Sequence, residues 1–363
     1  MDPGARRVPS HRGVPAPGLR QAGHAQAQGL GGVPGAVSGL IDVHTHLAAL
    51  PADGNGCRMS AKMRRSPAFR MTALRFGLPL EAPALANRRY LEALIAALDA
   101  SRRVASVVIL GMDGAYDRAG RLDESRTDFL ISNDYVFSCA ARDRRLLPGV
   151  SINPARADAA EELERCAARG AALVKTLAPA QAFDPAQPRF RPFFRRLGEL
   201  RLPLLSHVGF EFSLIGNDQS VGDLERLIPA LEEGATVIAA HGCSSGLFLF
   251  EKHFALMLEL VRRFPRFFID LSALTLPNRV GVLFRLRRHP ELSDRLVFGT
   301  DYPLPCLSYP ALAGGWGAFR RAASAPSPFD LQAEVLDALG IQARADPREL
   351  LAPACFSSGP KTG

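Results

Sequence analysis

The residues with the clearest chemical potential are two histidines one position apart, His44 and His46, within Ile41-Asp42-Val43-His44-Thr45-His46. In a β-strand, alternate side chains point the same way, so both imidazoles are expected side by side at the end of a strand. Imidazole nitrogen is a preferred ligand of zinc and related divalent metals. The pair therefore indicates a metal site, with a structural histidine pair at a strand end as the simpler alternative.

Other strand-like runs carry residues that could bind the same metal or move a proton. Apolar runs end in His207, in His241 and in Asp301, and Lys175 stands inside a further run. The carboxyl ends of parallel barrel strands all meet at one face. We therefore expect the histidine pair, these two histidines and the aspartate to converge there.

The elements that must position these residues follow one rhythm from Gly39 onward, in which short β-branched or Leu-rich runs alternate with longer helical patterns. The eight strand-like runs are Leu40–Val43, Val104–Leu110, Leu146–Ile152, Ala172–Leu177, Pro203–Ser206, Thr236–Ala240, Arg266–Leu271 and Arg295–Phe298. The clearest helical patterns are Arg88–Ala100, Ala159–Arg169, Asp223–Glu232, Leu247–Arg262 and Val280–Arg288.

This alternation indicates βαβ units around a parallel sheet that is buried on both faces. Eight such units predict an α/β fold, a (β/α)8 TIM barrel. An open doubly wound sheet is the alternative. No G-x-G-x-x-G follows the first run, so the usual sign of a dinucleotide-binding fold is missing.

The domain organisation follows from composition. Residues 1–39 are rich in Gly, Pro, Ala, Gln and Arg without periodicity, and we expect a disordered N-terminal tail. Residues 40–355 are expected to form one barrel domain with extra C-terminal helices from Pro328, and residues 356–363 a short tail. Two irregular insertions, 47–86 and 111–130, are expected on the C-terminal side of the barrel, where substrate-covering loops lie.

Composition excludes several classes of protein. The 363 residues are 47% hydrophobic, and no apolar run approaches the roughly 20 residues of a membrane span. Six scattered cysteines without a C-x-x-C pair, and no secretory signal, favour a cytoplasmic protein with reduced thiols. The formal charge of +8 comes almost entirely from arginines spread along the chain, which favours an arginine-biased composition over a nucleic-acid-binding surface.

The four strand-end motifs together carry a family resemblance. They are D-V-H-T-H at the first run, S-H-V-G at the fifth, A-A-H-G at the sixth and G-T-D-Y-P at the eighth. With them, about residues 40–340 resemble the amidohydrolase superfamily. Within it the chain is similar to the amidohydrolase-related branch, amidohydrolase family 2, which includes aminocarboxymuconate-semialdehyde decarboxylase-like enzymes. The motif set is specific for the superfamily and its metal site but not for one reaction.

The resemblance implies that His44, His46, His207 and Asp301 bind a divalent metal, most often zinc, with Mn²⁺, Fe²⁺ or Co²⁺ as alternatives. It implies that the metal-bound water is activated for attack near neutral pH. It also implies a catalytic role for Asp301, which would take the proton of that water and later give it to the leaving group.

The same resemblance gives His241 and Lys175 roles that depend on the number of metal ions. In a one-metal site, His241 is a catalytic residue that hydrogen-bonds the substrate or the attacking water. In a two-metal site, a carboxylated Lys175 bridges the ions, and His241 joins His207 on the second one. The branch is mostly mononuclear, which favours one ion, with Lys175 as a structural or anion-binding residue.

Two enzyme activities therefore fit the sequence. The first is a metal-dependent hydrolase of a small-molecule amide, ester or lactone, and the alternative is a metal-dependent decarboxylase of a small carboxylate. A basic barrel that binds nucleic acid or protein is a third class, but the complete ligand set argues against it. We expect a small-molecule substrate, no nucleic acid or membrane partner, and a homodimer as the default assembly.

Several residues carry weaker signals. Polar residues near the run ends that could contact substrate include Asp113, Glu211, Asp270 and Arg279. Arg279 could hold a substrate carboxylate, or it could lie at the surface. The Cys243 thiol is expected to be a packing residue rather than a nucleophile. The remaining histidines of the barrel region, His253 and His289, lie in helical patterns and are expected at the surface.

Overall fold

The computed structural model describes residues 39–357, except residues 53, 213–217 and 249. The expected N-terminal tail therefore lies outside the described residues, apart from Gly39. Of the expected C-terminal tail, Phe356 and Ser357 belong to the last helix, and residues 358–363 lie outside the described part.

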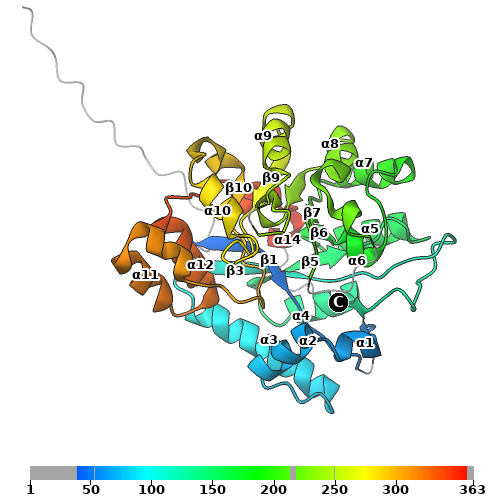
Figure 1. Ribbon diagram of the computed structural model, residues 1–363. Coiled ribbons are helices and arrows are strands. Elements are labelled where there is room, and N and C mark those ends of the chain that lie inside the picture. Colours follow the sequence, from blue (N-terminus) through cyan, green and yellow to red (C-terminus); the bar gives the residue numbers. More distant parts are fainter. Residues whose placement is uncertain (1–38, 53, 213–217, 249, 358–363) are drawn as a thin grey trace, which may run out of the picture. The chain divides into compact units, whose positions relative to one another are not determined.

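Eight parallel strands form the centre of the molecule and confirm the predicted TIM barrel (Figure 1). They are β1 (Leu40–His46), β3 (Val104–Leu110), β5 (Leu146–Ser151), β6 (Leu173–Thr176), β7 (Leu204–Ser206), β8 (Val237–Ala239), β9 (Phe267–Asp270) and β10 (Leu296–Val297). Each strand pairs with the next in this order. The barrel closes where the amide of Val43 donates to the carbonyl of Phe298 at 3.1 Å and that of His46 to Tyr302 at 2.6 Å.

Helices surround the strands, as the alternating pattern predicts (Figure 1). They are α1 (Ala61–Arg64), α2 (Pro67–Arg75), α3 (Pro83–Ala100), α4 (Asn133–Ala140), α5 (Ala159–Ala168), α6 (Ala178–Gln181), α7 (Arg191–Leu200), α8 (Ile228–Glu232), α9 (Phe254–Arg263), α10 (Val280–Leu286), α11 (Trp316–Ala323), α12 (Pro328–Ala338), α13 (Pro347–Leu350) and α14 (Ala354–Ser357). Among the residues that the structure describes, none of these helices has both the length and the apolarity for a membrane crossing.

The strands divide the core into two layers. In β3, Val107 and Ile109 pack in the layer shared with the helices, whereas Val108 and Leu110 belong to a separate cluster inside the barrel. This two-sided burial explains why the strands are continuously apolar in sequence. The polar side chains at the carboxyl ends of the strands are therefore held by strands that are packed on both faces.

The C-terminal helices close the barrel on the side opposite the carboxyl ends of the strands. Leu351 and Cys355 join the inner cluster, and the amide of Ala352 donates to the carbonyl of Ala172, just before β6. This segment therefore covers the amino-terminal ends of the strands, and α14 lies behind the barrel in Figure 1. The carboxyl ends, where the candidate site lies, are left to the loops.

The two long insertions pair with each other, which the sequence does not predict. Strand β2 (Arg58–Met59) lies in the first insertion and pairs antiparallel with β4 (Phe129–Leu130), at the end of the second. A small core of Leu50, Met63 and Phe69 supports the first insertion. Both insertions follow the carboxyl ends of barrel strands, as expected for loops around a site.

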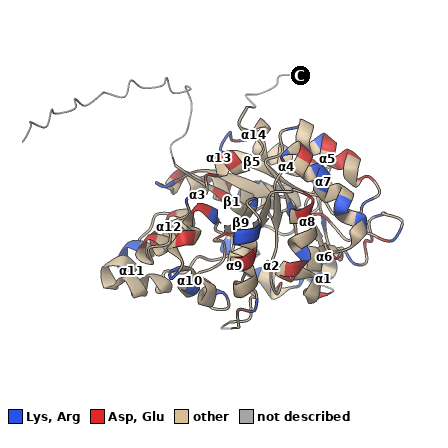
Figure 2. Cartoon of the chain, turned by 90° about the horizontal axis from the view of Figure 1, so that it is seen from above, with Lys and Arg blue, Asp and Glu red and all other residues tan. Residues whose placement is uncertain are grey.

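Charged residues of both signs share the outer helices (Figure 2). For example, Arg191 on α7 pairs with Glu232 at 2.7 Å and Glu233 at 3.0 Å, and Arg195 pairs with Glu233 at 2.8 Å. Such exposed pairs contribute little to stability, because water and salt screen the charges. The basic composition is therefore partly balanced by local acidic neighbours.

Candidate metal centre

An irregularity in the pairing of the first strand, β1, helps to place the histidine pair. The pairing of β1 with β3 shifts register between Asp42 and Thr45. Such a bulge re-aims side chains. The shift allows Ile41 to pack in the inner cluster while His44 also faces the barrel interior, where it contacts Lys175 and Asp270.

Three predicted ligands converge at this end of the barrel. The Nε2 atoms of His44 and His46 lie 3.2 Å apart, and Asp301 Oδ1 lies 3.4 Å from the first and 3.2 Å from the second. Burial raises the pKa of Asp301, but the two imidazoles outweigh it and bring the pKa to about 2. Two nitrogen donors and one ionised oxygen therefore face a shared point.

A buried carboxylate outside this trio fixes the orientation of His44. Asp270, at the end of β9, places Oδ2 2.6 Å from His44 Nδ1. Because the carboxylate can only accept, His44 donates from Nδ1 and keeps the lone pair on Nε2. A carboxylate behind a histidine is the usual support of a metal-binding imidazole. The sequence places Asp270 at a strand end but does not reveal this partner.

Asp42 joins the two chain segments that carry the trio. Its Oδ1 accepts the amides of His44 at 2.9 Å and Thr300 at 3.2 Å, and its Oδ2 accepts the Thr300 hydroxyl at 2.5 Å. Burial raises the pKa of Asp42 to about 7. This side chain thus holds the histidine pair and Asp301 in register.

Lys175 points its amine at the same trio. Its Nζ lies 3.0 Å from His44 Nε2, and the side chain is fully buried on β6. Burial lowers the pKa of Lys175 to about 8. The amine donates a hydrogen bond to the lone pair that a metal would use, so cation binding requires this contact to break.

His207 and His241 lie next to each other rather than in the tight trio. His241 Nε2 is 3.1 Å from His207 Nδ1, and His207 Nδ1 is also 3.5 Å from the Glu211 carboxylate. Burial, followed by the charge of Arg279, holds the pKa of both rings well below the usual value. The rings are therefore neutral at pH 7.

The donor set fits a divalent cation. Ligand atoms of His44, His46 and Asp301 all lie within 4.8 Å of one another. The buried Nε2 of His207 has no hydrogen-bond partner among the described residues, as expected of a nitrogen that has another ligand to bind. Neutral imidazoles and a carboxylate are the donors that zinc and related metals accept.

Two site residues adopt backbone conformations that side chains usually avoid. His241, two residues after the end of β8, has φ 60°, and Asp301 has φ 67°. Left-handed conformations of non-glycine residues cost about 1–3 kcal/mol each and concentrate at functional sites. Hydrogen bonds hold both turns, because the His241 amide donates to Asp270 Oδ1 at 2.8 Å and the Asp301 amide to the His44 carbonyl at 2.8 Å.

Arg279 lies inside the protein, so the surface alternative for this residue is wrong. The side chain is only 5% exposed, and its Nη2 donates to the carbonyl of Phe210 at 3.2 Å. Its Nη1 is buried without a hydrogen-bond partner among the described residues. A buried guanidinium normally has its donors paired, so Arg279 has a donor available for a ligand.

The surface expectation is also wrong for His253. This residue is 2% exposed, and α9 begins at Phe254 rather than at Leu247, so His253 is the N-cap residue of the helix and does not lie on its outer face. His289 is half-buried. The Cys243 thiol is buried, and burial raises its pKa well above the usual value, in agreement with a packing role.

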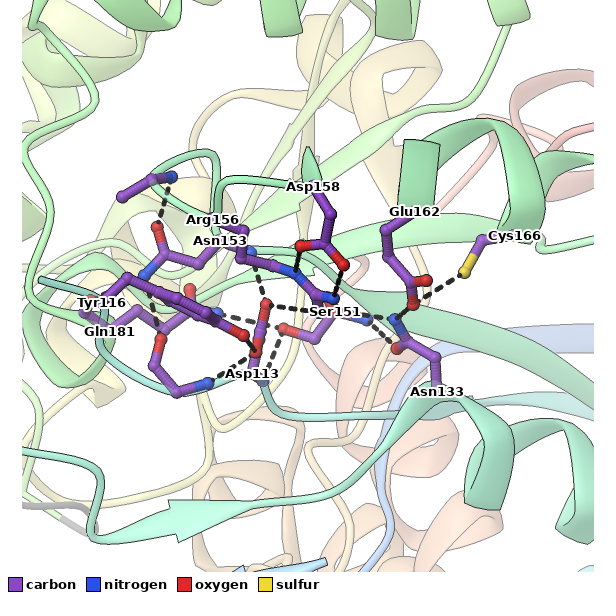
Figure 3. A network of polar contacts seen from close by, with 12 residues as sticks. Asp113, Tyr116, Asn133, Ser151, Asn153, Arg156, Asp158, Glu162, Cys166 and Gln181 are labelled. Atoms are coloured by element: carbon purple, nitrogen blue, oxygen red, sulfur yellow. Dashed lines mark hydrogen bonds and ion pairs between the residues drawn. The ribbon is translucent and has the colours of Figure 1, made fainter. Parts of the chain in front are cut away.

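Asp113 joins a separate polar network rather than the trio (Figure 3). Its carboxylate accepts hydrogen bonds from the Tyr116 hydroxyl and the Asn153 amide, both at 2.8 Å, and lies 3.4 Å from Arg156 Nη1. A cavity of about 440 Å³ adjoins this network. Asn133 and Glu162, which also line the cavity, bond each other at 2.6 Å. These contacts indicate a structural network between β3, β5 and α5.

No match was found among curated proteins. One similar solved structure is an uncharacterized TIM-barrel protein from Bordetella bronchiseptica, with 19% identity, 86% of this chain and 95% of that chain covered, and a TM-score of 0.53. A probable 2-pyrone-4,6-dicarboxylic acid hydrolase from Acinetobacter baumannii, with citric acid bound, has 14% identity, coverage of 86% and 98%, and a TM-score of 0.52.

A third similar structure is IDCase from Metarhizium anisopliae in apo form, with 15% identity, coverage of 88% and 96%, and a TM-score of 0.50. At these identities the structures support the barrel fold alone. The family model described as Amidohydrolase matches residues 41–340, which span the barrel from the first strand to α12. The chain therefore belongs to the amidohydrolase family and is an enzyme, as its strand-end motifs predict.

Proposed function

We propose that the protein is a metal-dependent hydrolase that acts on a small molecule through one divalent cation, most simply zinc. The convergence of His44 Nε2, His46 Nε2 and Asp301 Oδ1 carries this proposal. These three residues, with His207 as the fourth, would hold the cation. When bound, the cation supplies Lewis-acid activation of water and of the substrate carbonyl.

The protein's own residues manage the proton. Asp301 is ionised, and its Oδ2 lies on the side of His241, 3.8 Å from His241 Nδ1. Asp301 takes the proton from the attacking water and returns it to the leaving group. His241 is neutral and buried, and its ring nitrogens contact Ser272 and His207, so a hydrogen bond from His241 to the substrate or the water would require one of these contacts to open.

Arg279 supports a substrate that carries a carboxylate. Its Nη1 is a buried cationic donor without a hydrogen-bond partner in the described part of the chain, and such donors bind carboxylates strongly. Its charge influences both His207 and His241, which indicates that it lies near the proposed reaction centre. A similar structure holds citric acid, and its name refers to a dicarboxylic acid, which supports the same substrate class.

The same observation favours decarboxylation of a small carboxylate as the second candidate. An arginine that binds the carboxylate and a cation that polarises the substrate serve either reaction, so the two differ in the bond that breaks. We infer a cytoplasmic enzyme without a nucleic-acid partner, in line with its composition.

The experiment that tests the proposal combines metal quantification with an activity screen. The metal-free protein is reloaded with Zn²⁺, Mn²⁺ or Co²⁺ and assayed with lactones, esters and amides with and without a carboxylate, while CO₂ release is followed in parallel. We expect hydrolysis that depends on about one metal per chain. CO₂ release without hydrolysis would favour the second candidate, and metal-independent turnover would contradict both.

Asp301→Asn is the matched variant for the proton step. It preserves size and removes the base, so we expect loss of nearly all turnover, about 10²–10⁴-fold, with the fold retained. Circular dichroism and thermal unfolding check the fold. Near-normal kcat in this variant would contradict the role assigned to Asp301.

A further inference from the structure

A hydroxyl that the proposed reaction does not use lies in the middle of the site. Ser272 follows β9 by two residues and is fully buried. Its Oγ is 2.5 Å from Asp270 Oδ1, 2.8 Å from His241 Nδ1 and 3.1 Å from His44 Nδ1. One proton and two lone pairs must serve these three neighbours, which restricts how the protons can be arranged.

The first step is the direction of the bond between Ser272 and Asp270. Asp270 Oδ1 also accepts the amides of His241 at 2.8 Å and Ser272 at 3.0 Å, while Oδ2 accepts from His44 Nδ1 at 2.6 Å. A carboxylate surrounded by donors has no proton to give. The hydroxyl of Ser272 therefore donates to Asp270.

The second step concerns His241. Because the only proton of Ser272 Oγ goes to Asp270, this oxygen must accept from His241 Nδ1. A neutral imidazole carries one N–H, so His241 has its proton on Nδ1 and a lone pair on Nε2.

The third step concerns which ring nitrogen of His207 carries the proton. His241 Nε2 lies 3.1 Å from His207 Nδ1, so His207 must donate from Nδ1. The Glu211 carboxylate, 3.5 Å from the same nitrogen, favours the same orientation. The lone pair of His207 then lies on Nε2, the buried atom that has no hydrogen-bond partner among the described residues.

We propose that Ser272 is a positioning residue that fixes the tautomers of His241 and His207 and so keeps Nε2 of His207 unprotonated for a cation. Without the hydroxyl, His241 can place its proton on Nε2 and donate to His207 Nδ1. His207 must then carry its proton on Nε2, and a protonated nitrogen cannot bind a metal. The use of this nitrogen by a cation rests on the proposed function, whereas the tautomers do not.

The test measures tautomers in the metal-free protein at neutral pH. Protein labelled with ¹⁵N-histidine is examined by long-range ¹⁵N–¹H correlation, and the resonances are assigned with His207→Gln and His241→Gln. We expect the wild type to show both rings with protonated Nδ1. In Ser272→Ala, we expect a substantial Nε2–H population in both rings, and Ser272→Thr should restore the wild-type pattern.

Cobalt titration provides the second readout. We expect Ser272→Ala to bind Co²⁺ about 10- to 100-fold more weakly, as is typical when a residue behind the metal ligands is lost. Ser327→Ala is the control, since Ser327 is a buried helix-capping serine at α12, and its removal should cost stability without changing Co²⁺ affinity.

Two results would overturn the proposal. A wild-type spectrum with His241 protonated on Nε2 refutes it without any variant, even if Ser272→Ala does not fold. Unchanged tautomers in a folded Ser272→Ala variant refute it as well. If only the proposed function is wrong, the wild type binds no Co²⁺, although both rings carry the proton on Nδ1 as predicted.

Discussion

The link between Asp270 and His44 yields the most specific prediction about the site. Asp270→Asn keeps the size of the side chain and one acceptor oxygen. The three donors at Oδ1, namely the His241 amide, the Ser272 amide and the Ser272 hydroxyl, can still be accepted. The new amide nitrogen would then face His44 Nδ1, which is 2.6 Å from Oδ2 in the present structure.

Two donors cannot face each other at that distance, so His44 must move its proton to Nε2 or turn away. Either response removes a nitrogen from the proposed metal trio. Loss of such support weakens metal binding about 10- to 100-fold, which corresponds to about 1.4–2.8 kcal/mol. The loss of one charged hydrogen bond also lowers the free energy of unfolding by about 1–3 kcal/mol.

The assay is calorimetric titration of the metal-free protein with Zn²⁺, together with urea unfolding. Asp330→Asn is the matched control, because Asp330 is a buried carboxylate outside the site that accepts the Ser101 hydroxyl at 2.6 Å and the Arg102 amide at 2.9 Å. It should lose stability but keep its affinity for Zn²⁺. An Asp270→Asn variant that binds Zn²⁺ as tightly as the wild type would refute the role of Asp270.

Three further predictions address other residues. Arg279→Met should raise KM for carboxylate substrates about 10- to 100-fold and leave neutral analogues little changed in steady-state assays, whereas an equal loss for both would contradict carboxylate binding. Lys175→Met should bind one cation at least as tightly as the wild type in a metal titration, since the amine no longer contacts His44 Nε2. If the wild type binds two ions per chain and the variant binds fewer, Lys175 is a bridging ligand instead. Burial lowers the pKa of His253 from 6.5 to about 4. Between these pH values the unfolded state binds a proton that the folded state does not bind, so the free energy of unfolding falls as pH falls from about 6.5 to about 4. Urea unfolding at several pH values should show a shallower loss for His253→Gln than for the wild type or for the half-buried control His289→Gln, and identical slopes would contradict the prediction.

The barrel could be predicted from the sequence because each strand carries its own signal. A run such as Val104–Leu110 is apolar on both faces, and the structure forms β3 over the same residues. Strand ends also mark where the polar residues meet, so the convergence of His44, His46 and Asp301 follows from topology. The pairing of β2 with β4 has no such signal, since each is only two residues long.

The supporting contacts of the site depend on geometry that no local pattern contains. Ser272 and His44 are 228 positions apart in the chain, and only the closed barrel brings them together. The burial of Arg279 could not be foreseen, because arginine is rarely buried and its sequence neighbours give no sign of it. For His253, the helical pattern from Leu247 predicts too long a helix, since α9 begins only at Phe254, with His253 as its N-cap residue.

The central claim is that His44, His46 and Asp301, joined by His207, hold one divalent cation. The most direct measurement is an anomalous difference map from crystals of the zinc-loaded protein, collected on both sides of the zinc absorption edge. We predict one strong peak per chain in contact with His44, His46 and Asp301. A peak bound elsewhere, or a fully loaded protein with no peak between these residues, would contradict the account.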